Sequence, residues 1–335
     1  EIIIHLLAHP DHREKPDRLE SCLARLRGAF SFVFLAPDAL FAARDPYGYR
    51  PLALGRIGDA AWVVASETSA FDLIGASYIR DVEPGELVRI DASGLTSTRF
   101  AAPSGTTAQC IFEHVYFARP DSLVFGSLVY ESRLNAGRTL AKEHPVEADI
   151  VIPVPDSGIY AAQGYADESG IPFSMAMIRN HYIGRTFILP EQSDRDFRVR
   201  IKLNVVRDVV KGKRVVVVDD SIIRGTTTRS RVNLLKAAGA SEIHMRIACP
   251  PTRHPCYYGI DFPDPDQLIA HKCSIEEIRI AIGATSLGYL SEEGLLRSVG
   301  NGAGKWCMAC FNGRYAVKPS CATVRKDSME DSRGC

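Results

Sequence analysis

Residues 214–228 read RVVVVDDSIIRGTTT, and this stretch decides the fold of the second part of the chain. Its four consecutive valines, with no polar alternation, predict a central parallel strand that is covered on both faces. A helix is predicted from about Thr227 to Ala238, ending at Gly239, and another strand over residues 242–248. A strand, a helix and a strand in this order predict the βαβ unit of an open α/β sheet.

The end of the valine strand carries two carboxylates, and a hydroxyl-rich loop follows them. The helix N-terminus after this loop offers free N–H groups and a partial positive charge, which suit a phosphate. Gly225 allows close backbone approach, and the threonine hydroxyls add donors and cap the helix. Asp219 and Asp220 are suited to accept hydrogen bonds from a vicinal diol or to help hold Mg²⁺. The alternative is an acidic turn that caps a helix, which the flanking segments make less favoured.

This stretch lacks two common nucleotide-binding motifs and matches a different signature. It lacks the Gly-Lys-Ser/Thr ending of a Walker loop and the Gly-x-Gly-x-x-Gly of a dinucleotide site. It resembles the signature with which phosphoribosyltransferases bind 5-phosphoribosyl 1-pyrophosphate (PRPP). The resemblance implies that Asp219 and Asp220 bind the ribose hydroxyls. It also implies that the 5-phosphate is bound by the loop residues Ser221, Arg224, Gly225, Thr226, Thr227 and Thr228.

A second loop follows the buried strand predicted over residues 149–154. Residues 155–158 read PDSG, which by itself is an ordinary turn. The resemblance makes it the pyrophosphate loop, with Asp156, Ser157 and Gly158 binding PRPP. It also implies that Mg²⁺ lies near Ser157, Asp219 and Asp220.

An arginine-rich stretch covers residues 179–204. One interpretation is a solvated loop. The other is a lid whose cations close over pyrophosphate and exclude water. Residues 182–187, YIGRTF, are similar to the flexible loop of amidophosphoribosyltransferases, which implies that Arg185 and Lys202 also bind PRPP.

The first part of the chain has the pattern of β-hairpins, with strands predicted over residues 29–35, 61–66 and 86–90. Antiparallel strands with short turns predict an α+β domain, and the small, polar residues 101–107 read as a linker. Four segments resemble amidophosphoribosyltransferases: residues 44–52 (RDPYGYRPL), 65–68 (ASET), 79–86 (IRDVEPGE) and 110–122 (CIFEHVYFARPDS).

This resemblance covers about residues 1–315 and implies an α/β fold class with two domains. Residues 1–105 are expected to form a partial N-terminal-nucleophile glutaminase α+β domain. Residues 106–318 are expected to form a phosphoribosyltransferase domain with an open parallel sheet, C-terminal helices and iron–sulfur ligands. The polar residues 319–335 are expected to be a disordered tail.

The family's glutaminase uses an N-terminal cysteine as its nucleophile, with its own α-amino group as base. Residue 1 here is Glu1, and the family's Arg-Tyr-Ser-Thr and Asn-Gly-Asn segments are absent from the sequence. We therefore expect the front of the glutaminase domain to be missing, assign no catalytic residue and predict no glutaminase activity. Cys22 stands at helical spacing among apolar residues and is predicted to be a core residue.

The chain has nine cysteines and no secretion signal, which predicts a reducing, cytoplasmic setting. By itself, the Cys-x-x-Cys at residues 307–310 is compatible with half a zinc site, a redox pair or chance. The resemblance to iron–sulfur amidophosphoribosyltransferases implies a structural or oxygen-sensing [4Fe-4S] cluster. Its ligands would be Cys110, Cys256, Cys307 and Cys310.

The composition limits the possible partners. The 40 Lys and Arg residues balance 40 Asp and Glu residues, which argues against a nucleic-acid or membrane surface. The resemblance implies a homo-oligomer that makes 5-phosphoribosylamine, pyrophosphate and glutamate from PRPP and glutamine or ammonia. This is the first committed step of purine biosynthesis, which purine nucleotides inhibit. The less favoured alternatives are a PRPP-sensing regulator and a base-salvage transferase.

Overall fold

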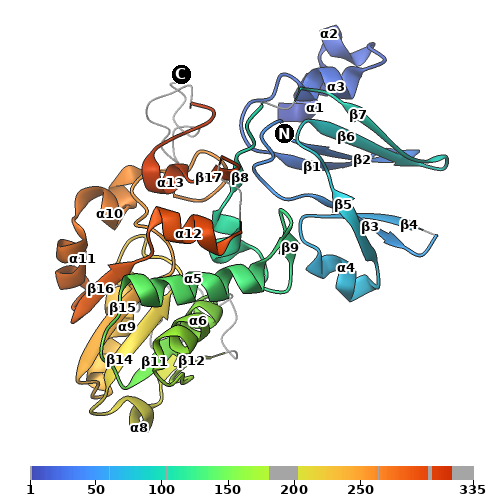
Figure 1. The fold of residues 1–335 in the computed structure, drawn as a ribbon. Helices are drawn as coiled ribbons and strands as arrows, with labels where there is room; N and C mark the ends of the chain where they lie inside the picture. The colour runs from blue at the N-terminus through green and yellow to red at the C-terminus, as the bar shows by residue number, and fades with distance from the viewer. Residues whose placement is uncertain are drawn as a thin grey trace, which may run out of the picture.

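The computed structural model describes residues 2–59, 61–102, 105–180, 203–262, 264–300 and 304–318. A β-rich part formed by the beginning of the chain lies beside an α/β part formed by the rest (Figure 1). Within these ranges, no helix combines the length and the apolar composition that crossing a membrane requires.

The α/β part is built on a four-stranded parallel sheet. Its order is β11 (Ile150–Pro153), β14 (Arg214–Asp219), β15 (Glu242–Ile247) and β16 (Ser286–Tyr289). The four valines of β14 are fully buried, as the absence of polar alternation predicts. Three strands were thus predicted, whereas β16 was not, because it is only four residues long and contains a glycine.

Helices α5 (Val129–Glu143) and α6 (Ile159–Ser169) pack together beside this sheet (Figure 1). A Cβ atom on Gly137 of α5 would lie 1.9 Å from the carbonyl oxygen of Ala161. A Cβ atom on Gly164 of α6 would lie 2.0 Å from that of Leu134, so both positions require glycine. The predicted helix after β14 is α9 (Thr226–Ala237), which contacts α11 (Ile275–Ile282).

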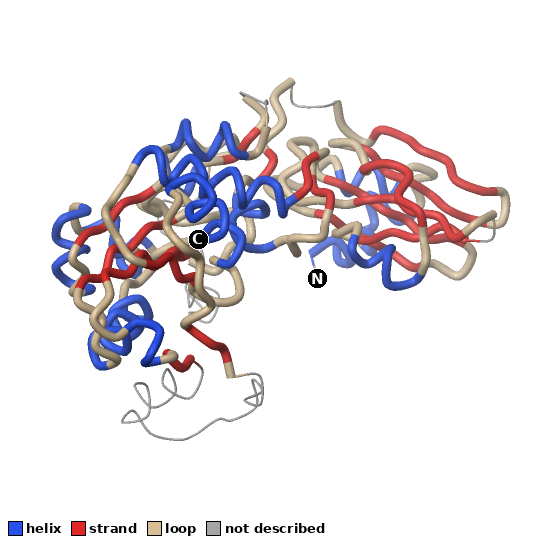
Figure 2. The backbone as a smooth tube through the Cα atoms, turned by 60° about the horizontal axis from the view of Figure 1, so that its bottom comes forward, coloured by secondary structure: helices blue, strands red, loops and turns tan. Residues whose placement is uncertain are grey.

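The β-rich part contains two antiparallel sheets, whose strands stand out in Figure 2. One has the order β1 (Ser31–Leu35), β2 (Ala39–Arg44), β6 (Glu86–Asp91) and β7 (Gly94–Arg99). The other has the order β4 (Ala61–Ala65), β3 (Ala53–Ile57) and β5 (Ser77–Asp81). Strands β3, β5 and β7 were not predicted, because glycines or charged residues interrupt their alternation.

Two helices, α1 (Ile2–Ala8) and α3 (Arg18–Leu23), pack against the first of these sheets. Of the residues of α1, Ile3 is buried, whereas Ile2 is 66% and Ile4 59% exposed. Cys22 is fully buried, as predicted.

The remaining elements are short. They are α2 (Pro10–Arg13), α4 (Ser69–Ile74), β8 (Gln109–Cys110), the π-helix Glu113–Phe117, β9 (Leu123–Val124), β10 (Ser127–Leu128), β12 (Met177–Arg179), β13 (Leu203–Val205), α8 (Arg207–Val210), the 3₁₀ helix Pro265–Gln267, α10 (Ile269–Lys272), α12 (Glu292–Ser298), β17 (Trp306–Cys307) and α13 (Ala309–Asn312).

The two parts are joined through polar and aromatic contacts around Arg50. Its Nη1 atom lies 2.7 Å from Glu113 Oε1, and its Nε and Nη2 atoms donate to the carbonyl oxygen of Tyr258. The ring of Tyr49 stacks on that of Tyr258 at 4.2 Å. Strand β17 also returns to pair in parallel with β8, so late and early residues of the α/β part meet at the junction.

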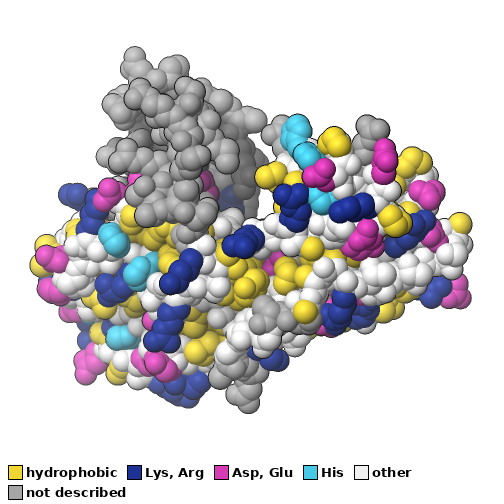
Figure 3. Space-filling model, turned by 90° about the horizontal axis from the view of Figure 1, so that it is seen from above, with side chains coloured by type: hydrophobic (Ala, Val, Ile, Leu, Met, Phe, Trp, Pro, Cys, Tyr) yellow, Lys and Arg dark blue, Asp and Glu magenta, His cyan; other side chains and the backbone are white. Residues whose placement is uncertain are grey.

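Charged side chains of both signs are interspersed on the face seen in Figure 3. This distribution agrees with the equal numbers of acidic and basic residues in the chain. The described residues of that face therefore form no extended field of one sign to attract a polyanion.

Candidate functional site

A cavity of about 1120 Å³ opens at the carboxyl ends of β11 and β14. Ligands bind at this edge in open α/β sheets, because loops and helix N-termini converge there. Most of the predicted PRPP residues line it: Asp156, Ser157, Asp219, Asp220, Ser221, Arg224, Gly225, Thr226, Thr227 and Thr228. Gly158 lies next to the lining residues, and Arg185 and Lys202 fall outside the described residues.

The two predicted carboxylates are buried but differ in their partners. Asp219 forms an ion pair with Arg231 through Oδ2, and its Oδ1 accepts the N–H of Asp220 at 3.1 Å. Among the described residues, the side-chain groups that donate to Asp220 are hydroxyl groups, at Oδ1 from Ser221 and at Oδ2 from Ser157. Burial raises the pKa of Asp219, against the opposing effect of the Arg231 guanidinium.

The hydroxyl-rich loop differs from the prediction in one respect. The threonines were expected to cap the helix, but the N-cap residue of α9 is Gly225, which has no side chain to cap it. Gly225 has φ +76°, a left-handed conformation that favours glycine, and its Cβ would lie 2.7 Å from Ile269 Cδ1. Thr226 and Thr227 are exposed on the cavity wall, while Thr228 is buried. Two of the hydroxyl groups therefore face a space that a phosphate can enter.

The loop of residues 155–158 lies against the carboxylate pair. Ser157 Oγ donates to Asp220 and so joins the two loops. A Cβ on Gly158 would lie 2.5 Å from the carbonyl oxygen of Val218 and 2.8 Å from that of Val154, so only glycine fits here. Asp156 forms an ion pair with Arg179 of β12 at the edge of the cavity.

Several lining residues were not predicted. Arg231 follows Thr227 by four positions in α9 and therefore lies on the same helix face, a spacing that could have revealed it. Arg133 of α5 is buried and donates to the carbonyl oxygens of His114 and Ala118. An aromatic wall had no signal of its own in the sequence; it consists of Phe112, Tyr116, Phe117 and Phe262.

The four cysteines assigned to a cluster come from different segments. Cys110 and Cys307 are paired residues of β8 and β17, Cys310 lies in α13, and Cys256 lies in the loop after β15. None is in a disulfide. Burial raises the pKa of Cys310, and the charges of the other three thiolates raise it further, which reflects their proximity.

The donor sets differ in how they suit the expected metals. Among the residues that the structure describes, no three His, Cys, Asp or Glu side chains surround a single ion. A [4Fe-4S] cluster binds four thiolates at separate corners, so this finding does not conflict with the cysteine set. Mg²⁺ needs only one or two carboxylates plus water and phosphate oxygens, which Asp220 with Ser157 fits.

Comparisons with known proteins agree with this architecture. A glutamine amidotransferase domain model matches residues 1–73, and a phosphoribosyl transferase domain model matches residues 131–265. The solved glutamine PRPP amidotransferase of B. subtilis, complexed with ADP and GMP, is 47% identical, with a TM-score of 0.90. The match covers 96% of this chain and 71% of that one. The chain belongs to the amidophosphoribosyltransferase family.

Members of the amidophosphoribosyltransferase family from plants and bacteria are also similar. The chloroplastic enzyme of Glycine max is 52% identical over 319 residues, which cover 95% of this chain and 56% of that protein. The protein of Mycobacterium tuberculosis (strain ATCC 25618 / H37Rv) is 52% identical over 301 residues, covering 88% of this chain and 56% of that protein. The chain thus spans little more than half the length of these relatives. The order of a glutamine amidotransferase domain and then a phosphoribosyltransferase domain is as predicted.

Proposed function

We propose that this chain binds PRPP with Mg²⁺ and replaces its pyrophosphate by ammonia, which yields 5-phosphoribosylamine, the first committed product of purine biosynthesis. The observation that supports this is the meeting, in one cavity, of a buried carboxylate pair and the hydroxyl-lined N-terminus of α9. A phosphate and a vicinal diol on one sugar match these two features.

Each subsite has its own residues in this proposal. Thr226, Thr227 and the free N–H groups of α9 hold the 5-phosphate. Asp219 and Asp220 accept hydrogen bonds from the ribose hydroxyls, and residues 155–158 face the pyrophosphate. Arg185 and Lys202 remain proposed lid cations. The aromatic wall limits the access of water to the reacting carbon.

The reaction is a displacement at ribose C1. The bond from C1 to the pyrophosphate oxygen breaks as the bond from C1 to nitrogen forms, and the added nitrogen then loses a proton. When bound by Asp220 and Ser157, Mg²⁺ supplies charge neutralisation for the leaving pyrophosphate. No side chain needs to attack covalently, because position and charge stabilisation lower the barrier.

We also propose that glutamine is the source of ammonia, since residues 1–73 match a glutamine amidotransferase domain. The related B. subtilis amidotransferase was solved in complex with ADP and GMP, which supports purine nucleotides as regulators here. A homo-oligomer belongs to the same proposal.

A [4Fe-4S] cluster on Cys110, Cys256, Cys307 and Cys310 is proposed as a structural or oxygen-sensing group. The proximity of four thiols from separate segments supports it, because bound iron would tie these segments together. Brown protein with stoichiometric iron and sulfide after anaerobic purification is expected. Colourless, iron-free protein under these conditions would contradict the cluster.

The activity is tested by pyrophosphate release from PRPP with ammonium, compared with a panel of nucleobases. Ammonium is used because the release of ammonia from glutamine is a separate step. Ammonium-dependent release that Asp220→Asn weakens at a fixed Mg²⁺ concentration is the expected result. Release that depends on a nucleobase would favour the salvage transferase, and PRPP binding without turnover would favour the sensor.

A further inference from the structure

We propose that Arg231 is a positioning residue that holds Asp219 as a fixed hydrogen-bond acceptor for the ribose, and that it leaves Asp220 with Ser157 to face the divalent cation. This inference rests on the proposed function, because it assigns different roles to the two carboxylates of the proposed PRPP site.

The partners of the two carboxylates carry the argument. The side chain of Asp219 is only 3% exposed, and a buried carboxylate is costly unless a cation or several donors compensate it. Arg231, itself 19% exposed, provides that cation at Oδ2, and the N–H of Asp220 occupies Oδ1. Asp219 is therefore neutralised and held from two sides before any ligand arrives.

Asp220 has the opposite surroundings. Its two oxygens accept the hydroxyl groups of Ser221 and Ser157, which are uncharged. A hydroxyl group can rotate and present a lone pair instead, so this group can become a set of oxygen ligands. Arg133 also lines the cavity, and its charge acts on Asp220. Its described hydrogen bonds, however, go to the backbone carbonyl oxygens of His114 and Ala118 and not to Asp220. A divalent cation thus gains more at Asp220 than at the already neutralised Asp219.

Helix α9 connects the two subsites. Arg231 lies one turn after Thr227 and Thr228, on the face of α9 that lines the cavity. The helix whose N-terminus receives the 5-phosphate therefore also holds the acceptor for the ribose hydroxyl. In addition, Nε of Arg231 is buried without a hydrogen-bond partner among the described residues, which leaves a donor for a ligand oxygen or a water.

The test is a double-mutant cycle of Arg231→Met and Asp219→Asn, read by calorimetric binding of PRPP at saturating Mg²⁺. Loss of a charge-assisted hydrogen bond predicts a Kd raised about tenfold or more by Arg231→Met in the wild type. Within Asp219→Asn, the same change should raise Kd by less than about threefold, because coupled residues are not additive. Arg231→Lys should retain part of the affinity.

The matched control is Arg229→Met, an exposed arginine of the same helix that does not line the cavity. It should bind PRPP as the wild type does. In Mg²⁺ titrations of pyrophosphate release, Arg231→Met should leave the half-saturating concentration unchanged while it raises KM for PRPP. Asp220→Asn should raise the Mg²⁺ requirement.

Several results would overturn the inference. One is an equal loss of affinity from Arg231→Met in both backgrounds, and another is a shift in Mg²⁺ requirement as large as that of Asp220→Asn. Thermal unfolding checks the fold of each variant, and the double variant, in which neither charge is left unpaired, should be as stable as the wild type. Failure of the wild type and of Arg229→Met to bind PRPP would instead refute the proposed function together with this inference.

Discussion

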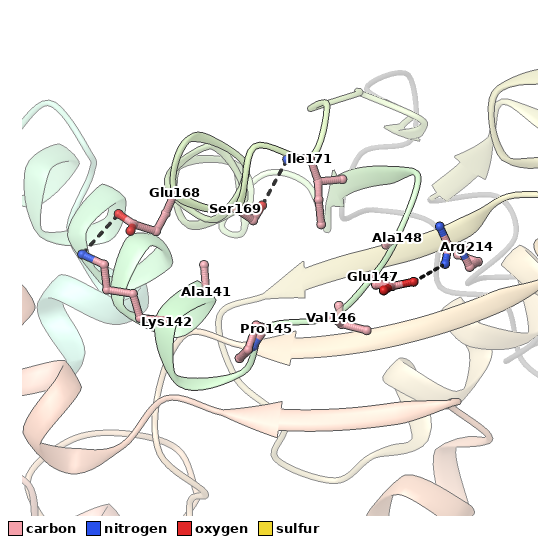
Figure 4. A pocket seen from close by; sticks show the side chains of 10 residues that line it. All are labelled: Ala141, Lys142, Pro145, Val146, Glu147, Ala148, Glu168, Ser169, Ile171 and Arg214. Atoms are coloured by element: carbon pink, nitrogen blue, oxygen red, sulfur yellow. Dashed lines mark hydrogen bonds and ion pairs between the residues drawn. The ribbon is translucent and has the colours of Figure 1, made fainter.

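The two edges of the parallel sheet both carry a hollow lined with charged residues, yet they differ in how those charges are held. At the carboxyl edge, Asp219 and Asp220 are buried beside a cavity of about 1120 Å³. At the amino edge, a hollow of about 460 Å³ is lined by residues including Lys142, Glu168 and Arg214 (Figure 4). Lys142 pairs with Glu168, and Arg214 with Glu147, each at 3.3 Å, and each pair has one largely exposed side chain, Lys142 at 65% and Glu147 at 93%.

Exposed ion pairs of this kind contribute little to stability and need no ligand, whereas buried carboxylates need partners that compensate their charge. The direction of the chain adds to the contrast. Helices α6 and α9 begin at the carboxyl edge, and their partial positive charge favours phosphate there. Helices α5 and α6 end near the amino edge, where the dipole favours cations instead. The presence of a hollow is thus a weaker sign of function than the burial of charge at a helix N-terminus.

The largest effect that distinguishes the two edges is expected from Asp220→Asn. Removing the charged acceptor should weaken PRPP binding about 100-fold in the presence of Mg²⁺, since a hydrogen bond to a charged group contributes about 1.5–3 kcal/mol. Calorimetry measures the affinity. The control at the amino edge is Glu147→Gln, whose side chain is 93% exposed and which should bind normally. Equal losses in the two variants would remove the distinction between the edges.

A second prediction concerns the buried His114 and the pH dependence of stability. Burial lowers the pKa of His114 to about 4, and the Arg133 cation acts in the same direction. The unfolded chain binds a proton below pH 6.5 while the folded chain resists it, so stability is lost as pH falls from 6.5 towards 4. His114→Phe should reduce the stability difference between pH 7 and pH 5 by about 2 kcal/mol.

Urea unfolding at each pH measures this difference. The ring of His114 packs edge-on against Trp306 at 5.3 Å, an environment that also suits phenylalanine. The control is His5→Phe, an exposed position that should retain the pH dependence of the wild type. An unchanged pH dependence in His114→Phe would show that another group is responsible.

The two ends of α6 provide a third comparison. Gly158→Ala at the carboxyl edge brings a Cβ against two carbonyl oxygens and should cost about 1–2 kcal/mol as well as activity, because backbone cannot move aside cheaply. Gly170→Ala at the other end has open space and only the penalty of φ +72°. Unfolding and pyrophosphate release measured on both variants test this. Normal activity in Gly158→Ala would show that the loop tolerates displacement.

The smallest effect is expected at the amino edge itself. Lys142→Ala removes an ion pair whose lysine is 65% exposed, so stability should change by less than about 0.5 kcal/mol. PRPP affinity should be unchanged. A loss of affinity comparable to that of Asp220→Asn would show that the amino edge takes part in binding.

Part of this molecule was predictable because its signals are local. The valine run of β14 needs no knowledge of its neighbours, and the capping box of Ser274 and Glu277 at the start of α11 has a Ser-x-x-Glu spacing that the sequence displays directly. Strand β16 was missed, since four residues with a glycine carry too little pattern. The expected threonine cap was wrong, because the left-handed Gly225 took the N-cap position and left the hydroxyl groups to the cavity.

Local pattern alone was therefore enough for the central βαβ unit, for the acidic pair at the strand end and for the change from a β-rich part to an α/β part. It could not show that Arg231 neutralises Asp219 and not Asp220, or that Arg50 joins the two parts through Glu113 and Tyr258. A strand or a cap depends on residues close in sequence, whose spacing is visible in the letters. Whether a charge is buried, and which group pairs with it, depends on the distant segments that pack against it. These contacts exist only in the tertiary structure.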